Sequence, residues 1–376
     1  MDAMEDMEVF TGSNPGLAPV CQVLGRGTLP GLKYRHLGKS GLKVSSIALG
    51  SLKSFSNDDS ELNEEIVTLA FENGINFFDI SEPFTSQKAE IELGRIIKKK
   101  GWSRRQFTVA TKIYWDKTED RALSRKEILE SVKDSLENLQ LDYIDLVIIH
   151  KNDSHCPLEE VVKAINFLIT TGKILYWGTA KWSPVEIFES FSIARAMNCV
   201  TPLCEYAEYH PFHREKVELY MAELYNKVGL GLITWSPVSL GLVLGTSEEQ
   251  TQLVTKLAFK SGKYKVGQDA NGIHEGIHVA SHTVKQLEMI SERFGCTLSQ
   301  LLVCWSLRNN TSQVVVVSAS SLEQLTSQLS SLQLLSKMNS CLLEEMDRIL
   351  GNKPTRQPMV STLQQRWTAT GGVPPQ

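Results

Sequence analysis

The feature that most constrains the fold is a repeat of short apolar runs and helix-length segments along the chain. Eight runs rich in β-branched residues alternate with segments whose apolar residues recur at three- and four-residue spacing. The runs cover residues 44–51, 76–81, 106–114, 143–150, 173–180, 202–209, 230–236 and 313–320. Parallel strands need crossover connections, and eight strand–helix units spaced roughly 30 residues apart close naturally into a barrel. The sequence therefore predicts an α/β fold, a (β/α)8 TIM barrel.

The alternative arrangement is an open, doubly wound sheet, which such a repeat also permits. A sheet of that kind normally carries a glycine-rich fingerprint directly after its first strand. The corresponding stretch here, ALGSLKS at 48–54, lacks the fingerprint. We therefore prefer the barrel.

Several segments fall outside the repeat. Residues 1–31 mix acidic residues with Gly, Pro and Ser and predict a flexible N-terminal leader, while residues 357–376 predict a flexible tail. The barrel is expected over 32–356, with a polar insertion at 241–281. An insertion after the carboxyl end of a strand lies on the catalytic face of such a barrel, where a lid would sit. The apolar spacing in CLLEEMDRILGN predicts a further helix after the eighth unit.

The composition indicates a cytoplasmic protein and excludes several classes of partner. A formal charge of −4 with 22% charged residues gives no basic footprint for nucleic acid. Seven scattered cysteines without a CxxC pair indicate reduced thiols. The acidic stretch MDAMEDMEVF is not a signal peptide, and no window approaches the roughly 18 apolar residues of a spanning helix. Any membrane association is therefore expected through a partner.

Three short motifs suggest chemistry that their surroundings do not support. GKS at 38–40 lies too far from its upstream glycine, Gly31, for a phosphate loop, so we interpret LGKSGL as a turn between two short strands. HEGIH at 274–278 matches a zinc-protease pattern, but two glycines break the helix that the pattern needs, and no metal is expected. The basic run KKKGWSRR at 98–105 is interpreted as a solvated helix end and loop.

Polar residues at the carboxyl ends of barrel strands are the first candidates for chemistry. Asp79 ends the second predicted strand, Lys112 lies near the end of the third, and His150 ends the fourth. Lys112 stands in an otherwise apolar run and needs an anion to offset its desolvation, and Asp79 on the adjacent strand is the natural partner. A catalytic site and a purely structural buried ion pair are equally compatible with these residues.

Longer stretches carry a resemblance to a known family over nearly the whole chain from residue 32. They are KYRHLGKSGLKVS, GINFFDISE, KAEIELGRIIKKKGW, LSRKEILESVKDSLENLQLDYIDLV, YWGTAKWSPVEI, CEYAEYHPFHREKVE, TWSP, ERFGCTLSQL and RILGNKP. On these stretches the chain resembles an aldo-keto reductase and, within that superfamily, the cytoplasmic β-subunits of Shaker-type voltage-gated potassium channels. FDISE, IIHK and KPTRQPMVSTL are most similar to the insect Hyperkinetic-type branch.

The resemblance implies an aldo-keto reductase barrel with NADP(H) as cofactor and an aldehyde or ketone as substrate. In the family, hydride passes to the carbonyl carbon while a tyrosine phenol, activated by a lysine–aspartate pair, protonates the oxygen. Asp79 and Lys112 match the pair, and His150 matches the residue that orients the carbonyl. The tyrosine position, counted forward from Asp79, is Phe84, which has no proton to give. Tyr114 shares the face of Lys112 if the strand alternates regularly, but full rescue by Tyr114, Lys112 or His150 is not expected.

The cofactor-binding positions are also implied by the resemblance, and many depart from the family's pattern. They are Leu52, Ala180, Lys181, Tyr206, Trp235, Ser236, Pro237, Val238, Ser318, Ser320 and Gln324. TWSP is intact, whereas Ala-Lys replaces Ser-Arg at 180–181 and Tyr206 replaces a glutamine, where its ring would stack on the nicotinamide. The family's Gly, Glu and Asn near the adenosine phosphate are Ser318, Ser327 and Gln328 here. These exchanges put the affinity for NADP(H) in question, although the scaffold is retained.

Three functions are compatible with this resemblance. The first is a regulatory β-subunit that docks as a four-fold ring, a homotetramer, beneath the cytoplasmic domains of a voltage-gated potassium channel α-subunit. The second is a working NADPH-dependent aldehyde or ketone reductase, and the third is a scaffold that binds NADP(H) as a redox gauge without turnover. The channel-type stretches favour the first, while Phe84 counts against the second. Membrane contact is expected only through the channel, and no nucleic-acid partner is expected.

The missing phenol at position 84 predicts negligible turnover of model aldehydes by the purified protein. Phe84→Tyr should raise the rate, because general acid catalysis is typically worth ~10²–10⁴-fold. The measurement is NADPH oxidation, followed by nicotinamide absorbance with both proteins at equal concentration. A wild-type rate equal to that of the variant would show that position 84 does not limit turnover.

Overall fold

The computed structural model describes residues 29–51, 59–80, 86–114, 123–151, 153–235, 283–309 and 311–355. Within them, eight parallel strands close into a barrel in the order β10-β3-β4-β5-β6-β7-β8-β9. The strands are β3 (Ile47–Gly50), β4 (Phe77–Ile80), β5 (Thr108–Ile113), β6 (Ile144–His150), β7 (Ile174–Ala180), β8 (Cys204–Glu208), β9 (Gly231–Trp235) and β10 (Val314–Val317). Each lies inside one of the eight predicted runs, so the predicted (β/α)8 barrel is confirmed.

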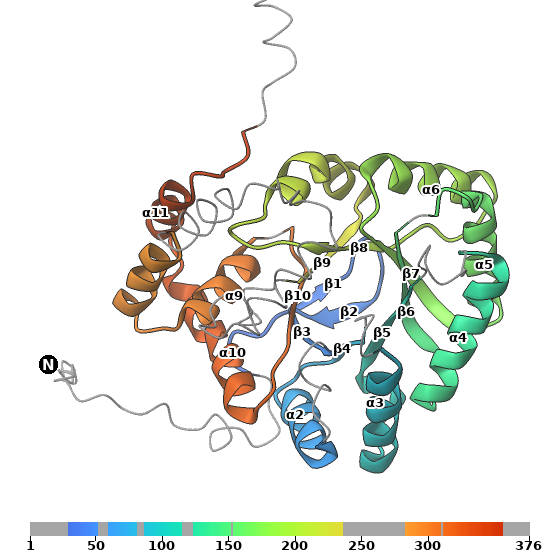
Figure 1. The fold of residues 1–376 in the computed structure, drawn as a ribbon, viewed down its shortest axis with the longest axis horizontal. Helices are drawn as coiled ribbons and strands as arrows, with labels where there is room; N and C mark the ends of the chain where they lie inside the picture. Colours follow the sequence, from blue (N-terminus) through green and yellow to red (C-terminus); the bar gives the residue numbers. More distant parts are fainter. Residues whose placement is uncertain are drawn as a thin grey trace, which may run out of the picture.

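Helices surround the barrel, and the colours of Figure 1 follow the chain around it. They are α2 (Ser60–Glu72), α3 (Ser86–Lys100), α4 (Arg125–Leu139), α5 (Leu158–Thr170), α6 (Pro184–Ala196), α9 (Leu298–Arg308), α10 (Leu322–Leu334) and α11 (Ser340–Leu350), with a helical segment at 283–293. The turns η3 (Lys216–Tyr220) and η4 (Leu224–Val228) are π-helical, and η2 (Arg104–Gln106) and η5 (Leu335–Lys337) are 3-10 helical. Among these described helices, none is both long and apolar enough to cross a bilayer.

The segments predicted outside the repeat are only partly described. The helix expected from CLLEEMDRILGN is present as α11. The insertion at 241–281 and the tail at 357–376 lie outside the described residues, as does the leader up to residue 28. Leu29, at the end of the predicted leader, is buried in the core.

Local capping signals explain where several helices begin. The Asp59 side chain accepts hydrogen bonds from two backbone N–H groups in the first turn of α2. Ser183 begins α6 through a capping box with Glu186, and Thr297 begins α9 in the same way with Gln300. Each cap satisfies N–H groups that have no partner within the helix, and this fixes the residue at which the helix begins.

A hairpin closes the amino-terminal end of the barrel. Strands β1 (Tyr34–His36) and β2 (Lys43–Ser45) pair antiparallel, and Leu37 at their turn is fully buried among interior barrel residues. Gly38 has a φ of 54°, and a Cβ there would lie 2.5 Å from the carbonyl oxygen of Leu203. Only glycine tolerates both conditions. LGKSGL is therefore the turn that the sequence predicted.

Strand alternation divides the barrel side chains into two sets. The inward set forms a small interior cluster, and the outward set packs against the helices in a larger one. Near the carboxyl ends, the inward positions change from aliphatic to charged or aromatic. These positions are Asp79, Lys112, His150, Tyr206 and Trp235. The fold thus gathers them at one rim.

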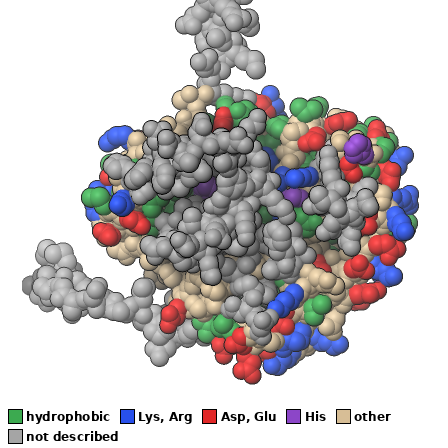
Figure 2. Space-filling view, viewed as in Figure 1, with side chains coloured by type: hydrophobic (Ala, Val, Ile, Leu, Met, Phe, Trp, Pro, Cys, Tyr) green, Lys and Arg blue, Asp and Glu red, His purple; other side chains and the backbone are tan. Residues whose placement is uncertain are grey.

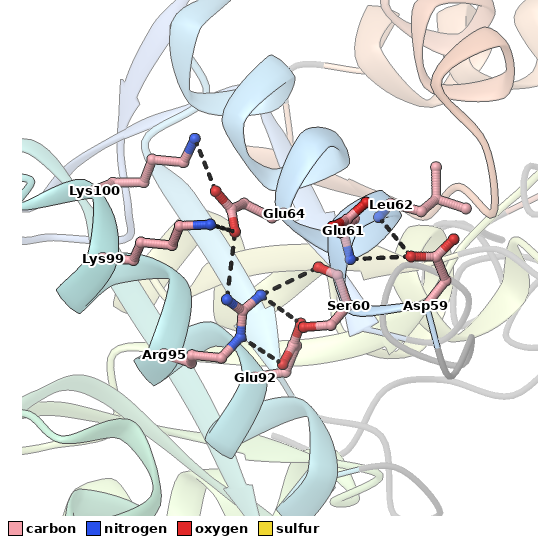
Figure 3. Close-up of polar contacts among 9 residues, drawn as sticks. All are labelled: Asp59, Ser60, Glu61, Leu62, Glu64, Glu92, Arg95, Lys99 and Lys100. Atoms are coloured by element: carbon pink, nitrogen blue, oxygen red, sulfur yellow. Dashed lines mark hydrogen bonds and ion pairs between the residues drawn. The ribbon is translucent and has the colours of Figure 1, made fainter.

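A charged network joins α2 to α3 on the outside of the barrel (Figure 3). The carboxylate of Glu64 on α2 lies 2.8 Å from the Nζ of Lys99 and 3.1 Å from that of Lys100. A guanidinium nitrogen of Arg95 lies 3.3 Å from the same carboxylate. These cations, the hydrogen bond from Lys99 first, lower the pKa of the Glu64 carboxyl to about 2.

The basic run at 98–105 is engaged by neighbouring residues. Lys98 donates a hydrogen bond to the Gln140 side chain, and Arg104 forms an ion pair with Asp145. Acidic and basic side chains are also interspersed over the lower and right-hand rim of the molecule in Figure 2. The run is thus a helix end and loop bonded to its own fold, as predicted, and not an isolated basic patch.

Glu64→Gln should lower the free energy of unfolding at neutral pH by about 1 kcal/mol, since the cations remain partly exposed to water. A carboxyl with a lowered pKa contributes its stability above its ordinary value of about 4.5, and loses it as the pH falls toward about 2. The difference between wild type and variant, measured by urea unfolding, should therefore shrink over that range.

The control for this test is Glu72→Gln, at an exposed position at the end of the same helix. It should change stability little at any pH. A Glu64→Gln effect that stays constant with pH would show that the ion pairs are not its source.

Candidate active site

Five side chains approach one another at the carboxyl end of the barrel. Asp79 lies on β4, His150 ends β6 and Tyr206 lies on β8. Lys112 lies on β5, and Tyr114 follows two residues later, so both project to the same side of the strand. The structure thus brings together the three polar residues that the sequence singled out and the two tyrosines that the sequence also placed near the site.

Tyr206 lies between the opposite charges of Asp79 and Lys112. Its hydroxyl donates a hydrogen bond of 2.8 Å to Oδ2 of Asp79, and the Nζ of Lys112 lies 3.8 Å from the centroid of its ring. Exposure is 2% for Asp79, 4% for Tyr206 and 8% for Lys112. Both contacts offset the desolvation of a buried charge. Tyr206 therefore contacts both Asp79 and Lys112. The direct ion pair predicted between those two residues stays a prediction.

Tyr114 extends this chain of contacts to His150. The two ring centroids lie 4.6 Å apart with an interplanar angle of 43°. The Nζ of Lys112 lies 5.5 Å from the Tyr114 ring centroid. Regular alternation predicts that Tyr114 shares the face of Lys112, and the structure places its ring beside both Lys112 and His150. A continuous path of contacts therefore crosses the mouth from Asp79 through Tyr206, Lys112 and Tyr114 to His150.

His150 is held in its neutral form. Burial is the main cause, and the positive charges of Lys112, Lys181 and Lys151 add to it, so that the pKa of the imidazole falls from 6.5 to about 2. A neutral imidazole can donate one N–H to a carbonyl oxygen but has no additional proton to release. The neutral form fits the orienting role implied for His150, and it excludes the imidazolium as a proton donor at neutral pH.

Two lysines leave the strand ends in left-handed backbone conformations. The φ angles are 56° for Lys151 and 61° for Lys181, and the N–H of Lys151 donates a 2.8 Å hydrogen bond to the carbonyl of Ala180. This conformation is uncommon for residues other than glycine, and backbone strain of that kind is concentrated at functional sites. Both residues also place positive charge near the mouth, which suits the cofactor-binding position assigned to Lys181.

The residues predicted at the phosphate end meet where β10 leads into α10. The backbone N–H and the hydroxyl of Ser320 both donate to Oε1 of Gln324, at 2.9 and 3.0 Å. The side-chain amide of Gln328 donates to the carbonyl of Ser318 at 3.0 Å. The amino end of a helix after the last strands of a TIM barrel is a common site for phosphate. The structure therefore groups Ser318, Ser320 and Gln324 at the amino end of α10, where a phosphate could bind.

The described residues fit a nicotinamide dinucleotide laid across the mouth. Tyr206 and Trp235 supply aromatic surface. Ala180 lies on β7, between His150 on β6 and Tyr206 on β8, and its small side chain leaves room beside these rings. The buried hydroxyl of Ser51, at the end of β3, has no hydrogen-bond partner among the described residues and offers a donor at the rim. Residues 318–328 contain an acidic and no basic side chain, so the phosphate end there has only neutral donors.

Five predicted site positions lie outside the described residues, and so does the HEGIH motif. The positions are Leu52, Phe84, Ser236, Pro237 and Val238. Their predicted roles stay predictions. Within the described part of the chain, no group of His, Cys, Asp and Glu side chains is arranged to hold a metal ion.

A buried charge that the sequence did not reveal lies directly behind the site. Glu205 is fully buried on β8, and its carboxylate accepts hydrogen bonds from Thr179 at 2.6 Å and from the Nζ of Lys216 at 2.7 Å. Because Glu205 precedes Tyr206, this ion pair anchors the strand that presents the phenol. The available signal was a glutamate inside the apolar strand CEYAE, whose partners cannot be read from local sequence.

The fold and the mouth together define a class of protein. A model of the aldo/keto reductase family matches residues 46–348, which include all eight barrel strands. The chain therefore belongs to the aldo/keto reductase family. Members of this family generally bind NAD(P)H, in keeping with the fit of the mouth to a nicotinamide dinucleotide.

Tyr206→Phe removes the hydroxyl that donates to the buried carboxylate of Asp79. A buried acceptor left without its partner costs about 1–3 kcal/mol, so the free energy of unfolding at neutral pH should fall by about that amount. Urea unfolding measures the change.

The matched control is Tyr220→Phe, because Tyr220 is 56% exposed and bonds to Glu215 at the surface. That variant should change stability by no more than about 0.5 kcal/mol. Equal effects of the two substitutions would show that the Tyr206–Asp79 bond stabilises the fold no more than a surface bond does.

Proposed function

We propose that this chain is a cytoplasmic regulatory β-subunit of a voltage-gated potassium channel, with an aldo-keto reductase barrel that binds NADP(H) but reduces carbonyl compounds slowly. The channel part is supported by the resemblance of CEYAEYHPFHREKVE and KPTRQPMVSTL to channel β-subunits. As in that group, the protein would assemble as a homotetramer and reach the membrane only through the channel's cytoplasmic domain.

The catalytic part of the proposal is carried by the hydrogen bond from Tyr206 to Asp79. In the family, the aspartate and lysine serve a phenol that faces the substrate. Here Phe84 has no hydroxyl, while Asp79 accepts a hydrogen bond from the Tyr206 hydroxyl and Lys112 lies over the same ring. The charged pair therefore serves a phenol whose hydroxyl points toward a carboxylate, an arrangement that favours burial of charge over proton transfer to a substrate.

The remaining residues support binding of the cofactor and substrate more than turnover. Bound NADP(H) would supply the hydride. The neutral imidazole of His150 would orient the carbonyl oxygen, and Trp235 and Tyr206 would line the floor beneath it. Slow turnover lengthens the life of each bound nucleotide, so the state of the site would follow the cellular ratio of reduced to oxidised cofactor. This is the redox gauge compatible with a channel regulator.

An active NADPH-dependent aldehyde or ketone reductase is the second candidate. The observation that favours it is the phenol of Tyr114, which lies beside Lys112 and His150 at the mouth. Turnover by the wild type at the rate of Phe84→Tyr would select this candidate.

The test combines channel binding with cofactor binding. The full chain should form a four-to-four complex with the tetrameric cytoplasmic domain of a Shaker-type channel, measured by light scattering after size-exclusion chromatography. The same sample should bind NADP(H), seen as nicotinamide fluorescence, and should consume a model aldehyde only slowly.

The control is the cytoplasmic domain of an unrelated tetrameric channel, which should not bind. A monomer that binds neither domain would contradict the channel proposal. Binding of the channel domain without NADP(H) would reduce the protein to a scaffold and contradict the redox gauge.

A further inference from the structure

The mouth contains a phenol in surroundings of the kind that acid catalysis requires. We propose that Tyr114 is the proton donor for the carbonyl reduction that this barrel performs, in place of residue 84. The inference rests on the proposed NADP(H)-dependent function and assigns the acid of that same site.

The position of Tyr114 follows from strand geometry. It directly follows β5, two residues after Lys112, so alternation directs both side chains toward the barrel axis. Lys112 lies 5.5 Å from its ring centroid, and the His150 ring lies 4.6 Å from it. Tyr114 is half-buried, unlike Tyr206, which has 4% exposure. Its phenol therefore stands at the rim, where a carbonyl compound entering the mouth can reach it.

The other proton-bearing groups of the described mouth are less suited to the step. Tyr206 directs its hydroxyl to Asp79. His150 is neutral, and loss of its remaining N–H proton would create an anion in a buried site. Lys112 is buried with its ammonium group over the face of Tyr206, and loss of its proton would remove the charge that this contact holds. Tyr114 combines a phenol, a nearby cation and a neutral imidazole that can hold the same carbonyl oxygen.

The proposed step balances in atoms and charge. Bound NADPH would supply a hydride to the carbonyl carbon and become NADP⁺, while the carbonyl oxygen would take the hydroxyl proton of Tyr114. The phenol O–H bond breaks as the alcohol O–H bond forms. The resulting phenolate is stabilised by the positive charge of Lys112, and a proton from water at the rim restores the phenol.

Tyr114→Phe tests this role in the NADPH-loaded full chain. The single-turnover rate of aldehyde reduction should fall by about 100-fold, the lower range for loss of a general acid. Tyr176→Phe is the matched control, since Tyr176 is also half-buried but lies nearer the amino-terminal end of its strand, β7. It should leave the rate unchanged. Adding Phe84→Tyr to the Tyr114→Phe variant should recover activity by placing a phenol at the family's own position.

Binding of an unreactive amide provides a readout that needs no turnover. The carbonyl oxygen of benzamide accepts a hydrogen bond but not a hydride. Tyr114→Phe should weaken benzamide binding about 3–10-fold, as expected for loss of one neutral hydrogen bond, and Tyr176→Phe should not. Quenching of tryptophan fluorescence follows the binding, since Trp235 lies at the same end of the barrel.

The outcomes separate this inference from the proposed function. Equal turnover and equal benzamide affinity in wild type and Tyr114→Phe overturn the role of Tyr114, and so does an absence of benzamide binding by the wild type. A wild type that binds benzamide but no NADP(H) refutes the proposed function. In that case the benzamide affinity of Tyr114→Phe still decides whether the hydroxyl contacts a carbonyl.

Discussion

Lys112 places a full positive charge inside the barrel at 8% exposure, and a charge so buried is stable only with compensating groups around it. Tyr206 presents the face of its ring to this charge, and Asp79 receives the hydroxyl of the same ring. These partners come from β8 and β4, so closure of the barrel is what permits the burial. The charge in turn shapes the mouth, because it adds to burial in lowering the pKa of His150 and lies near the ring of Tyr114.

How much of this could be predicted depends on the range of each interaction. The strands were predictable because runs of β-branched residues at crossover spacing are local signals, and Asp79, Lys112 and His150 were predictable as polar residues at strand ends. Tyr206 was expected to stack on a nicotinamide, yet its hydroxyl meets a carboxylate 127 residues away, a contact set by barrel register. The partners of Glu205 were hidden for the same reason.

The two phenols of the mouth occupy different environments, so one is suited to stabilising the fold and the other to the proposed proton transfer. Tyr206 is buried and its proton points to a carboxylate, which makes it part of the support beneath the site. Tyr114 is half-buried beside a cation and a neutral imidazole. A family site whose acid has been lost can therefore keep its charged pair for folding, while any remaining reactivity passes to a different position on the rim.

The hairpin of β1 and β2 has a consequence for the end of the barrel at which a cofactor would bind. Leu37 is buried in the packed interior at the amino-terminal end of the barrel, so in the described part of the chain the polar and aromatic side chains of the candidate site face the opposite, carboxyl end. A cofactor bound at the candidate site would therefore approach from the carboxyl end, and a protein bound at the amino-terminal end would not cover that approach. If the proposed function holds, a subunit bound to its channel at the amino-terminal end would exchange its cofactor at the carboxyl end without having to detach.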